Sequence, residues 1–294
     1  MYLTYTIKRW GVGLEQYYRD IETRLELGKF AKPHHRPKDW QFRTDELEEL
    51  LRRTLIHTTC SFENGPAEPS VSYIHRKILE RVKAGDILIT FNYDTVIEES
   101  MPDSNCLWTP RDGYGIGVTG ITHNWAKNWL LNHNVPGSEK SKIKLLKLHG
   151  SINWKLYQNS DVRLKKRPYV VRARKGWPVF DSAAFIPPGW HKRVDRNPFK
   201  TLWSQARNSL EACKTLVIVG YSLPDTDLIA RALFLEVVRL RETKRSFIDK
   251  LHIADISDAV KDKTVNLFIP ALGPRGVVSR YKSAEDLAQS WNSS

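Results

Sequence analysis

The feature that most constrains the fold is a short apolar run that ends directly in polar residues, and the chain carries it three times. It occurs in residues 86–94, 143–151 and 215–222. In the first copy, Asn92 and Asp94 follow the apolar and β-branched residues 87–90. A run of this length and composition is typical of a buried strand. Because an open α/β sheet places its ligand site at the carboxyl ends of its strands, we expect the three polar ends to form one site.

The rest of the chain alternates helical and strand patterns. Apolar residues with helical spacing predict helices over residues 14–28, 45–62, 70–83, 95–100, 125–131, 199–213, 224–243 and 284–291. Further strands are predicted over residues 152–157, 247–256 and 265–269. The alternation predicts an α/β fold with a three-layer, Rossmann-like, mostly parallel sheet, a helical insertion and a small antiparallel hairpin.

We expect a single domain over residues 1–294, because this length and a hydrophobic content of 41% suit one large α/β domain. Its expected parts are a helical part (1–83), a sheet core (84–161 and 198–270), a basic hairpin with a Pro-rich loop (162–197), and a C-terminal tail with a helix (271–294). No apolar run approaches the roughly 18 residues that a membrane span needs. The N-terminus also lacks the pattern of a secretion signal, so a cytoplasmic location is expected.

The three cysteines, Cys60, Cys106 and Cys213, are far apart in the sequence. Their odd number and wide spacing encode neither a disulfide framework nor a Cys-x-x-Cys metal site. We therefore expect reduced, structural cysteines and no zinc.

The chain is basic, with 46 Lys and Arg against 33 Asp and Glu and a formal net charge of +13. The excess is concentrated in residues 163–175, a segment without an acidic residue. This segment has two interpretations: a surface for nucleic acid or another acidic partner, or a solvated hairpin whose basic side chains protect a sheet edge. A basic nucleic-acid-binding module is therefore an alternative function, although no recognition-helix pattern accompanies the charge.

The polar residues at the first two strand ends have both a chemical and a structural interpretation. Asn92 and Asp94 suit the orientation of a ligand hydroxyl or a water, but Asn and Asp also begin turns and cap helices. His149 is a candidate general base, since an imidazole exchanges protons near neutral pH, and a hydrogen-bonded structural histidine is the alternative. Gly150 and Ser151 beside it let a ligand approach the backbone or simply make a turn.

Two further positions fit a nucleotide ligand. Residues 220–222 (Gly-Tyr-Ser) lie between an apolar strand and a helix, so their N–H groups suit a phosphate or a ribose oxygen. Asp255, near the end of a predicted strand, resembles the acid that holds a ribose hydroxyl in nucleotide-binding sheets. Helix capping is an equal alternative for Asp255.

Three motifs together resemble a known family. Ile-Thr-Phe-Asn-Tyr-Asp at 89–94, Lys-Leu-His-Gly-Ser-Ile-Asn-Trp at 147–154 and Val-Gly-Tyr-Ser-Leu-Pro-Asp-Thr-Asp at 219–227 are similar to the sirtuin-like domain of bacterial NAD-consuming proteins of antiphage defence. The motifs occur in the family's order, and the resemblance spans roughly residues 14–270. It implies NAD binding in a Rossmann-like sheet and hydrolytic cleavage of the nicotinamide–ribose bond.

The resemblance also implies roles for individual residues. Asn92 and His149 correspond to the family's catalytic asparagine and histidine. Contacts to NAD, the expected substrate, are implied for Thr90, Phe91, Asp94, Gly150, Ser151, Gly220, Tyr221, Ser222, Asp227 and Asp255. The expected macromolecular partners are a second copy of the chain or a partner protein of the defence system.

The sequence departs from the family in two places. Protein-deacetylating sirtuins carry a zinc module with four cysteines, which this chain cannot build, so peptide deacetylation is not expected. Family members also begin with an apolar strand and a Gly-Ala-Gly loop for the pyrophosphate, whereas no buried strand precedes Gly11 and Gly13 here. We expect Met1 to lie inside the fold, which predicts exposed sheet edges that favour association. A catalytically inactive, N-terminally truncated scaffold is therefore a second alternative function.

Overall fold

The computed structural model describes residues 60–61, 68–69, 71–101, 108–110, 112–121, 140–156, 162–164, 172–174, 177–179, 184–186, 194–225 and 227–291. The helices predicted over 14–28 and 125–131 lie outside these residues. Of the helix predicted over 45–62, only Cys60–Ser61 is described, and it forms a short strand, β1, that pairs with β2 (Glu68–Pro69). The predicted end of that helix is therefore wrong, because pairing with a later segment overrides the local pattern.

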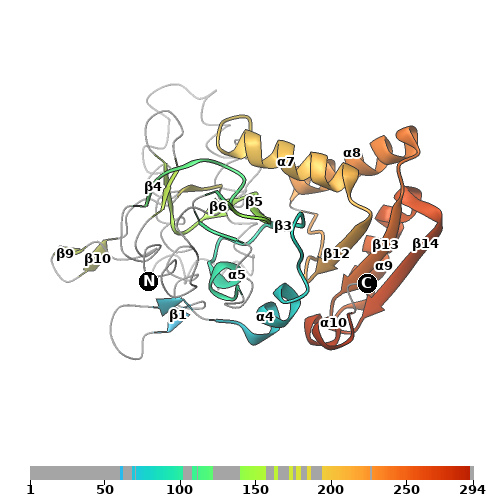
Figure 1. Ribbon diagram of the computed structural model, residues 1–294, viewed down its shortest axis with the longest axis horizontal. Helices are drawn as coiled ribbons and strands as arrows, with labels where there is room; N and C mark the ends of the chain where they lie inside the picture. The colour runs from blue at the N-terminus through green and yellow to red at the C-terminus, as the bar shows by residue number, and fades with distance from the viewer. Residues whose placement is uncertain are drawn as a thin grey trace, which may run out of the picture.

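Five of the strands that pair in parallel form two groups. β3 pairs with β5, and β12 pairs with β13, which pairs in turn with β14; all three pairings are parallel. The strands are β3 (Ile87–Thr90), β5 (Lys144–Lys147), β12 (Thr215–Val219), β13 (Ile248–Ala254) and β14 (Leu272–Tyr281). Figure 1 shows β3 and β5 on one side of β12, and β13 and β14 on its other side. The predicted α/β, mostly parallel, Rossmann-like architecture is confirmed.

Five helices match helices predicted from apolar periodicity. They are α4 (Tyr73–Leu79), α5 (Val96–Glu99), α7 (Phe199–Ala212), α8 (Leu228–Lys244) and α10 (Ala284–Ser290). Ser72 is the N-cap of α4, and Ser283 is the N-cap of α10. Each side chain accepts a hydrogen bond from a backbone N–H of the first turn, which has no partner within the helix. None of the helices in the described ranges is long and apolar enough to cross a bilayer.

The strand predicted over 265–269 is wrong. These residues end α9 (Asp258–Phe268) and begin the 3₁₀ helix η3 (Ile269–Ala271). The Ser257 side chain caps α9, and the buried residues Lys261, Thr264, Val265 and Phe268 follow a helical spacing rather than the alternation of a strand. β14 pairs in parallel with β13, so the sheet continues beyond residue 270 into the segment predicted as a C-terminal tail.

Besides the antiparallel pair of β1 and β2, three antiparallel pairs lie between β5 and α7 in the sequence. β7 pairs with β8, β6 with β11, and β9 with β10, all antiparallel, whereas β4 pairs parallel with β8. Their bounds are β4 (Val118–Ile121), β6 (Gly150–Ser151), β7 (Trp154–Leu156), β8 (Val162–Leu164), β9 (Arg172–Arg174), β10 (Trp177–Val179) and β11 (Ala184–Phe185). The predicted antiparallel strand at 152–157 and the small hairpin in the basic region are therefore present.

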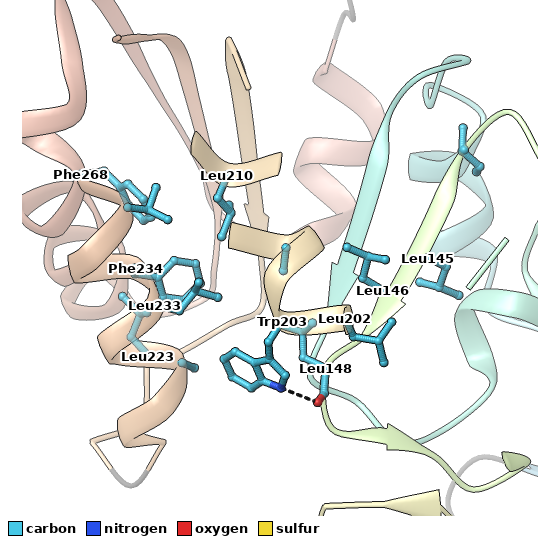
Figure 2. Close-up of a cluster of buried hydrophobic side chains, with 14 of the residues drawn as sticks. Leu145, Leu146, Leu148, Leu202, Trp203, Leu210, Leu223, Leu233, Phe234 and Phe268 are labelled. Atoms are coloured by element: carbon cyan, nitrogen blue, oxygen red, sulfur yellow. Dashed lines mark hydrogen bonds between the residues drawn. The ribbon is translucent and has the colours of Figure 1, made fainter. Parts of the chain in front are cut away.

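One hydrophobic cluster joins the two groups of parallel strands through α7. Figure 2 shows it extending from Leu145 and Leu146 of β5, past Leu202 of α7, to Phe234 of α8 and Phe268 of α9. All five side chains are buried. Because α7 has apolar residues on the sides that face both groups, it holds β5 and β12 in a common core.

Candidate active site

The residues after three parallel strands meet at one place. The ring of Phe91, directly after β3, stacks on Tyr221, which follows β12, with ring centroids 4.4 Å apart and an interplanar angle of 16°. The same Phe91 ring lies 5.3 Å from the ring of His149, which follows β5. The structure thus brings together one predicted site residue from each of the three polar strand ends.

The backbone around His149 is fixed by neighbours from other elements. Leu148 N donates to Thr90 O at 3.0 Å, and the indole Nε1 of Trp203 on α7 donates to Leu148 O at 3.0 Å (Figure 2). On the other side, Ile186 N donates to His149 O at 2.8 Å. Gly150 then turns the chain with a φ of +82°, a conformation that favours glycine. The position of His149 is therefore set by long-range contacts as well as by its own strand.

The His149 ring pairs with a carboxylate. Its Nε2 lies 3.3 Å from Oδ2 of Asp227, and each of the two residues is only 6% exposed. The other oxygen of Asp227, Oδ1, accepts from Ala230 N at 3.3 Å and caps α8. A buried carboxylate beside an imidazole orients the ring and stabilises its protonated form. The arrangement suits a histidine that takes up a proton during a reaction.

Aromatic rings surround this pair. Tyr93 stacks beside His149 with centroids 5.8 Å apart, and Trp203 lies 6.1 Å away on another side. The Tyr93 hydroxyl donates to Ile186 O at 2.8 Å, which holds that ring in place. These rings keep water away from most of the imidazole, so its pairing with Asp227 acts in a low-dielectric environment.

A model of the SIR2-like domain family matches residues 86–248, which is more than half of the 294-residue chain. The chain belongs to the SIR2-like domain family. The matched region contains Asn92, His149 and Asp227, whereas Asp255 lies just beyond it. SIR2-like domains bind NAD, so the family agrees with the sirtuin-like resemblance of the sequence motifs. No curated protein matches the chain.

In this SIR2-like domain the loop after β3 combines an exposed residue with local hydrogen bonds. Asn92 is exposed, and its backbone N donates to Thr90 Oγ1 at 3.1 Å. Asp94 Oδ1 accepts from Val96 N at 3.0 Å, which starts the turn into α5. Thr90 and Asp94 therefore shape the loop that presents Asn92, and their predicted contacts to NAD stay predictions.

Ser151 connects two of the motifs. It is fully buried, and its Oγ donates to Tyr93 O at 3.3 Å, while Ile152 N donates to the same carbonyl at 2.9 Å. These bonds tie the segment after His149 to the loop that carries Asn92. The predicted contacts of Gly150 and Ser151 to NAD also stay predictions.

The loop after β12 contains two residues with left-handed backbone conformation and is held by hydrogen bonds from a lysine of α9. Gly220 and Leu223 have φ values of +59° and +49°, and the second value is uncommon for a non-glycine residue. Lys263 of α9 donates to Leu223 O at 2.7 Å and to Asp225 Oδ1 at 3.0 Å. Ser222, which lies between Gly220 and Leu223 in the sequence, is exposed. The hydrogen bonds from Lys263 fix the loop that exposes Ser222, a predicted NAD contact.

Asp255 makes a turn contact at the end of β13. Its Oδ1 accepts from Ser257 N at 2.8 Å, directly before α9, and Ser257 rather than Asp255 is the N-cap of that helix. A contact of Asp255 to a ribose hydroxyl remains a prediction. Within the described ranges, no cluster of three or more His, Cys, Asp and Glu residues could hold a metal ion.

The sequence did not predict three contacts of His149. Asp227 was predicted as an NAD contact rather than as the partner of His149, and Tyr93 and Trp203 were not predicted as site residues. Asp227 stands directly before a strong helical pattern, so its capping role had a local signal. Tyr93 lies inside the motif at 89–94, whereas Trp203 had no local signal, because only the folded chain brings it to His149.

Proposed function

We propose that this SIR2-like domain is an NAD+ glycohydrolase that cleaves the bond between nicotinamide and ribose in bacterial antiphage defence. The observation that carries the reaction is the buried pair of His149 Nε2 and Asp227 Oδ2, 3.3 Å apart, at the strand ends of a family whose members bind NAD. The role in defence rests on the resemblance of the three motifs.

The proposed chemistry uses the positive charge of the nicotinamide ring, which makes it a good leaving group. Its departure creates an oxocarbenium-like ribose carbon, and Asn92 places a water or a ribose hydroxyl against that carbon. His149 takes the proton of the attacking O–H group, and Asp227 stabilises the imidazolium until the proton passes to solvent. With water as the nucleophile, NAD and water give nicotinamide, ADP-ribose and one proton.

The test is nicotinamide release from NAD by the chain and by single variants. We expect Asn92→Ala and His149→Ala to lower kcat by about 10² to 10⁴-fold each, the usual contribution of positioned acid–base groups. Asn208→Ala, at an exposed position of α7, and His252→Ala, on β13, are matched controls that keep their activity. Undiminished release by both site variants contradicts the assignment.

Calorimetry with NAD separates the enzyme from the inactive scaffold. Heat of binding without nicotinamide release would indicate a scaffold that binds NAD but no longer cleaves it. If millimolar NAD gives neither heat nor nicotinamide, the proposed function is wrong for this chain.

A further inference from the structure

Four polar side chains that the proposed reaction does not use lie buried beneath the strand ends. Lys147 is 1% exposed, Glu98 and Tyr114 are 0% exposed, and Asn153 is 2% exposed. Lys147 is the last residue of β5, and Glu98 lies in α5. Removing charges from water is strongly unfavourable unless they are paired, so a buried group of this kind needs an explanation.

Hydrogen bonds join the four side chains into one network. Lys147 Nζ lies 2.9 Å from Glu98 Oε1, and the Tyr114 hydroxyl donates to the same oxygen at 3.0 Å. Asn153 Nδ2 donates to the Tyr114 hydroxyl at 3.4 Å. Burial, and then the charge of Glu98, raise the pKa of Tyr114 well above its usual range, so this phenol stays protonated and can donate.

The lysine also reaches the loop that carries Asn92. Lys147 Nζ donates to the backbone carbonyl of Asp94, two residues after Asn92. Lys147 itself precedes His149 by two residues. A single ammonium group therefore connects the strand that ends at His149 with the loop that presents Asn92.

Stability alone is a poor explanation for this pair. A buried ion pair usually stabilises a fold no better than apolar residues of the same volume. Glu98 Oε2 is buried and accepts no hydrogen bond from the described residues, so within this part of the chain only one oxygen of the carboxylate is paired. What the pair supplies, and apolar residues would not, is a directional bond to the Asp94 carbonyl.

We infer that Lys147 and Glu98 are positioning residues that set the distance between Asn92 and His149 for NAD cleavage. This inference rests on the proposed function. Neither side chain touches the reacting atoms. Glu98 and Tyr114 fix the ammonium group, the ammonium group fixes the Asp94 carbonyl, and the carbonyl fixes the loop.

The inference predicts a change in kcat without a change in KM. Misplacement of a reacting group by about 1 Å can lower a rate by about 10²-fold. The other predicted contacts to NAD are spread over several strand ends, so the KM for NAD is not expected to depend on this carbonyl. A purely structural role would instead lower thermal stability and leave the kcat of the folded protein unchanged.

The test replaces the pair by apolar residues in the double variant Lys147→Met/Glu98→Leu, which avoids a lone buried charge. We expect a cooperatively folded protein whose kcat is at least about 10-fold lower and whose KM for NAD stays within about twofold. The matched control is Arg207→Met/Glu236→Leu. It removes an ion pair of 2.8 Å whose side chains are 36% and 53% exposed, between α7 and α8, and should keep its kcat. A kcat of the buried double variant within about twofold of the original chain overturns the inference.

Two further measurements cover the other outcomes. If the double variant does not fold, Tyr114→Phe is tested instead, because it removes only the hydroxyl that donates a hydrogen bond to Glu98. An unchanged kcat in the Tyr114→Phe variant overturns the inference. If the original chain releases no nicotinamide, the proposed function fails, and hydrogen exchange of residues 91–100 decides the positioning role instead. The buried variants should then exchange faster in this segment than the surface control, and equal exchange overturns the inference.

Discussion

Asp227 shows how one side chain serves two elements at the residue scale. One carboxylate oxygen faces His149, and the other caps α8 through Ala230 N. Asparagine caps helices about as well as aspartate but carries no charge. The two roles can therefore be separated by substitution.

We expect Asp227→Asn to lower kcat/KM about 10 to 100-fold with little loss of stability, since a hydrogen bond to a charged group contributes about 1.5–3 kcal/mol. Asp227→Ala should lose the same activity and, in addition, about 1 kcal/mol of stability from the missing cap. Nicotinamide release and urea unfolding measure the two effects. Equal stability of the two variants would contradict the capping role.

His252 gives a prediction for pH. Burial, and then the neighbouring Lys250, hold its pKa below the usual 6.5. The unfolded chain therefore binds a proton more readily than the folded chain, so this residue makes stability fall as the pH drops below about 6.5 and contributes nothing above that pH.

Urea unfolding at pH 5.5 and 7.5 checks this prediction. The His252→Gln variant should show a smaller difference between the two free energies of unfolding than the original chain. This variant also loses the contact between His252 Nδ1 and the Tyr281 hydroxyl at 3.1 Å, so Tyr281→Phe is the control for that contact. An identical pH difference in the original chain and the His252 variant would contradict the assignment.

At the scale of elements, α7 connects the core with the site. Trp203 packs in the core and donates its indole N–H to Leu148 O, directly before His149 (Figure 2). Trp203→Phe keeps an aromatic ring but leaves this buried carbonyl without its donor. We expect a loss of about 1–3 kcal/mol of stability and a lower kcat.

Denaturant unfolding and nicotinamide release measure these effects. The control is Trp291→Phe, directly after α10, where the indole lies beside His252 rather than His149. That variant should keep its kcat. The positioning role of Trp203 is wrong if its variant loses stability but keeps full activity.

At the scale of the whole molecule, a single cluster of buried side chains joins both groups of parallel strands. Leu202 of α7 is 0% exposed within it, whereas Leu235 of α8 is 50% exposed. We expect Leu202→Ala to lower the free energy of unfolding by about 2–5 kcal/mol and Leu235→Ala to change it by less than about 0.5 kcal/mol. Both variants should unfold in one transition. Two separate transitions in the original chain would contradict a shared core.

Elements with strong local signals can be predicted from the sequence alone. The strand at 87–90, the strand at 215–219 and the helix at 199–213 were predicted almost to the residue, because an apolar run or a helical spacing is a property of neighbours in the chain. The prediction of a strand over 265–269 was wrong because it also used only neighbouring residues in the chain. A five-residue window does not separate a buried strand from the end of a helix, and the cap at Ser257 and the pairing of β14 decide it.

The assembly of the site depends on tertiary contacts. The sequence motifs pointed to Asn92 and His149, but the partner of His149 lies 78 positions later in the chain, at Asp227. Lys147 is the first residue of the motif at 147–154, but nothing in the motif indicates its contacts with Glu98 and with the Asp94 carbonyl. Such contacts depend on which elements pack together, and no local pattern encodes that. The sequence therefore determined which residues stand at the strand ends, and the packing of α5, α7 and α8 decided what each of them touches.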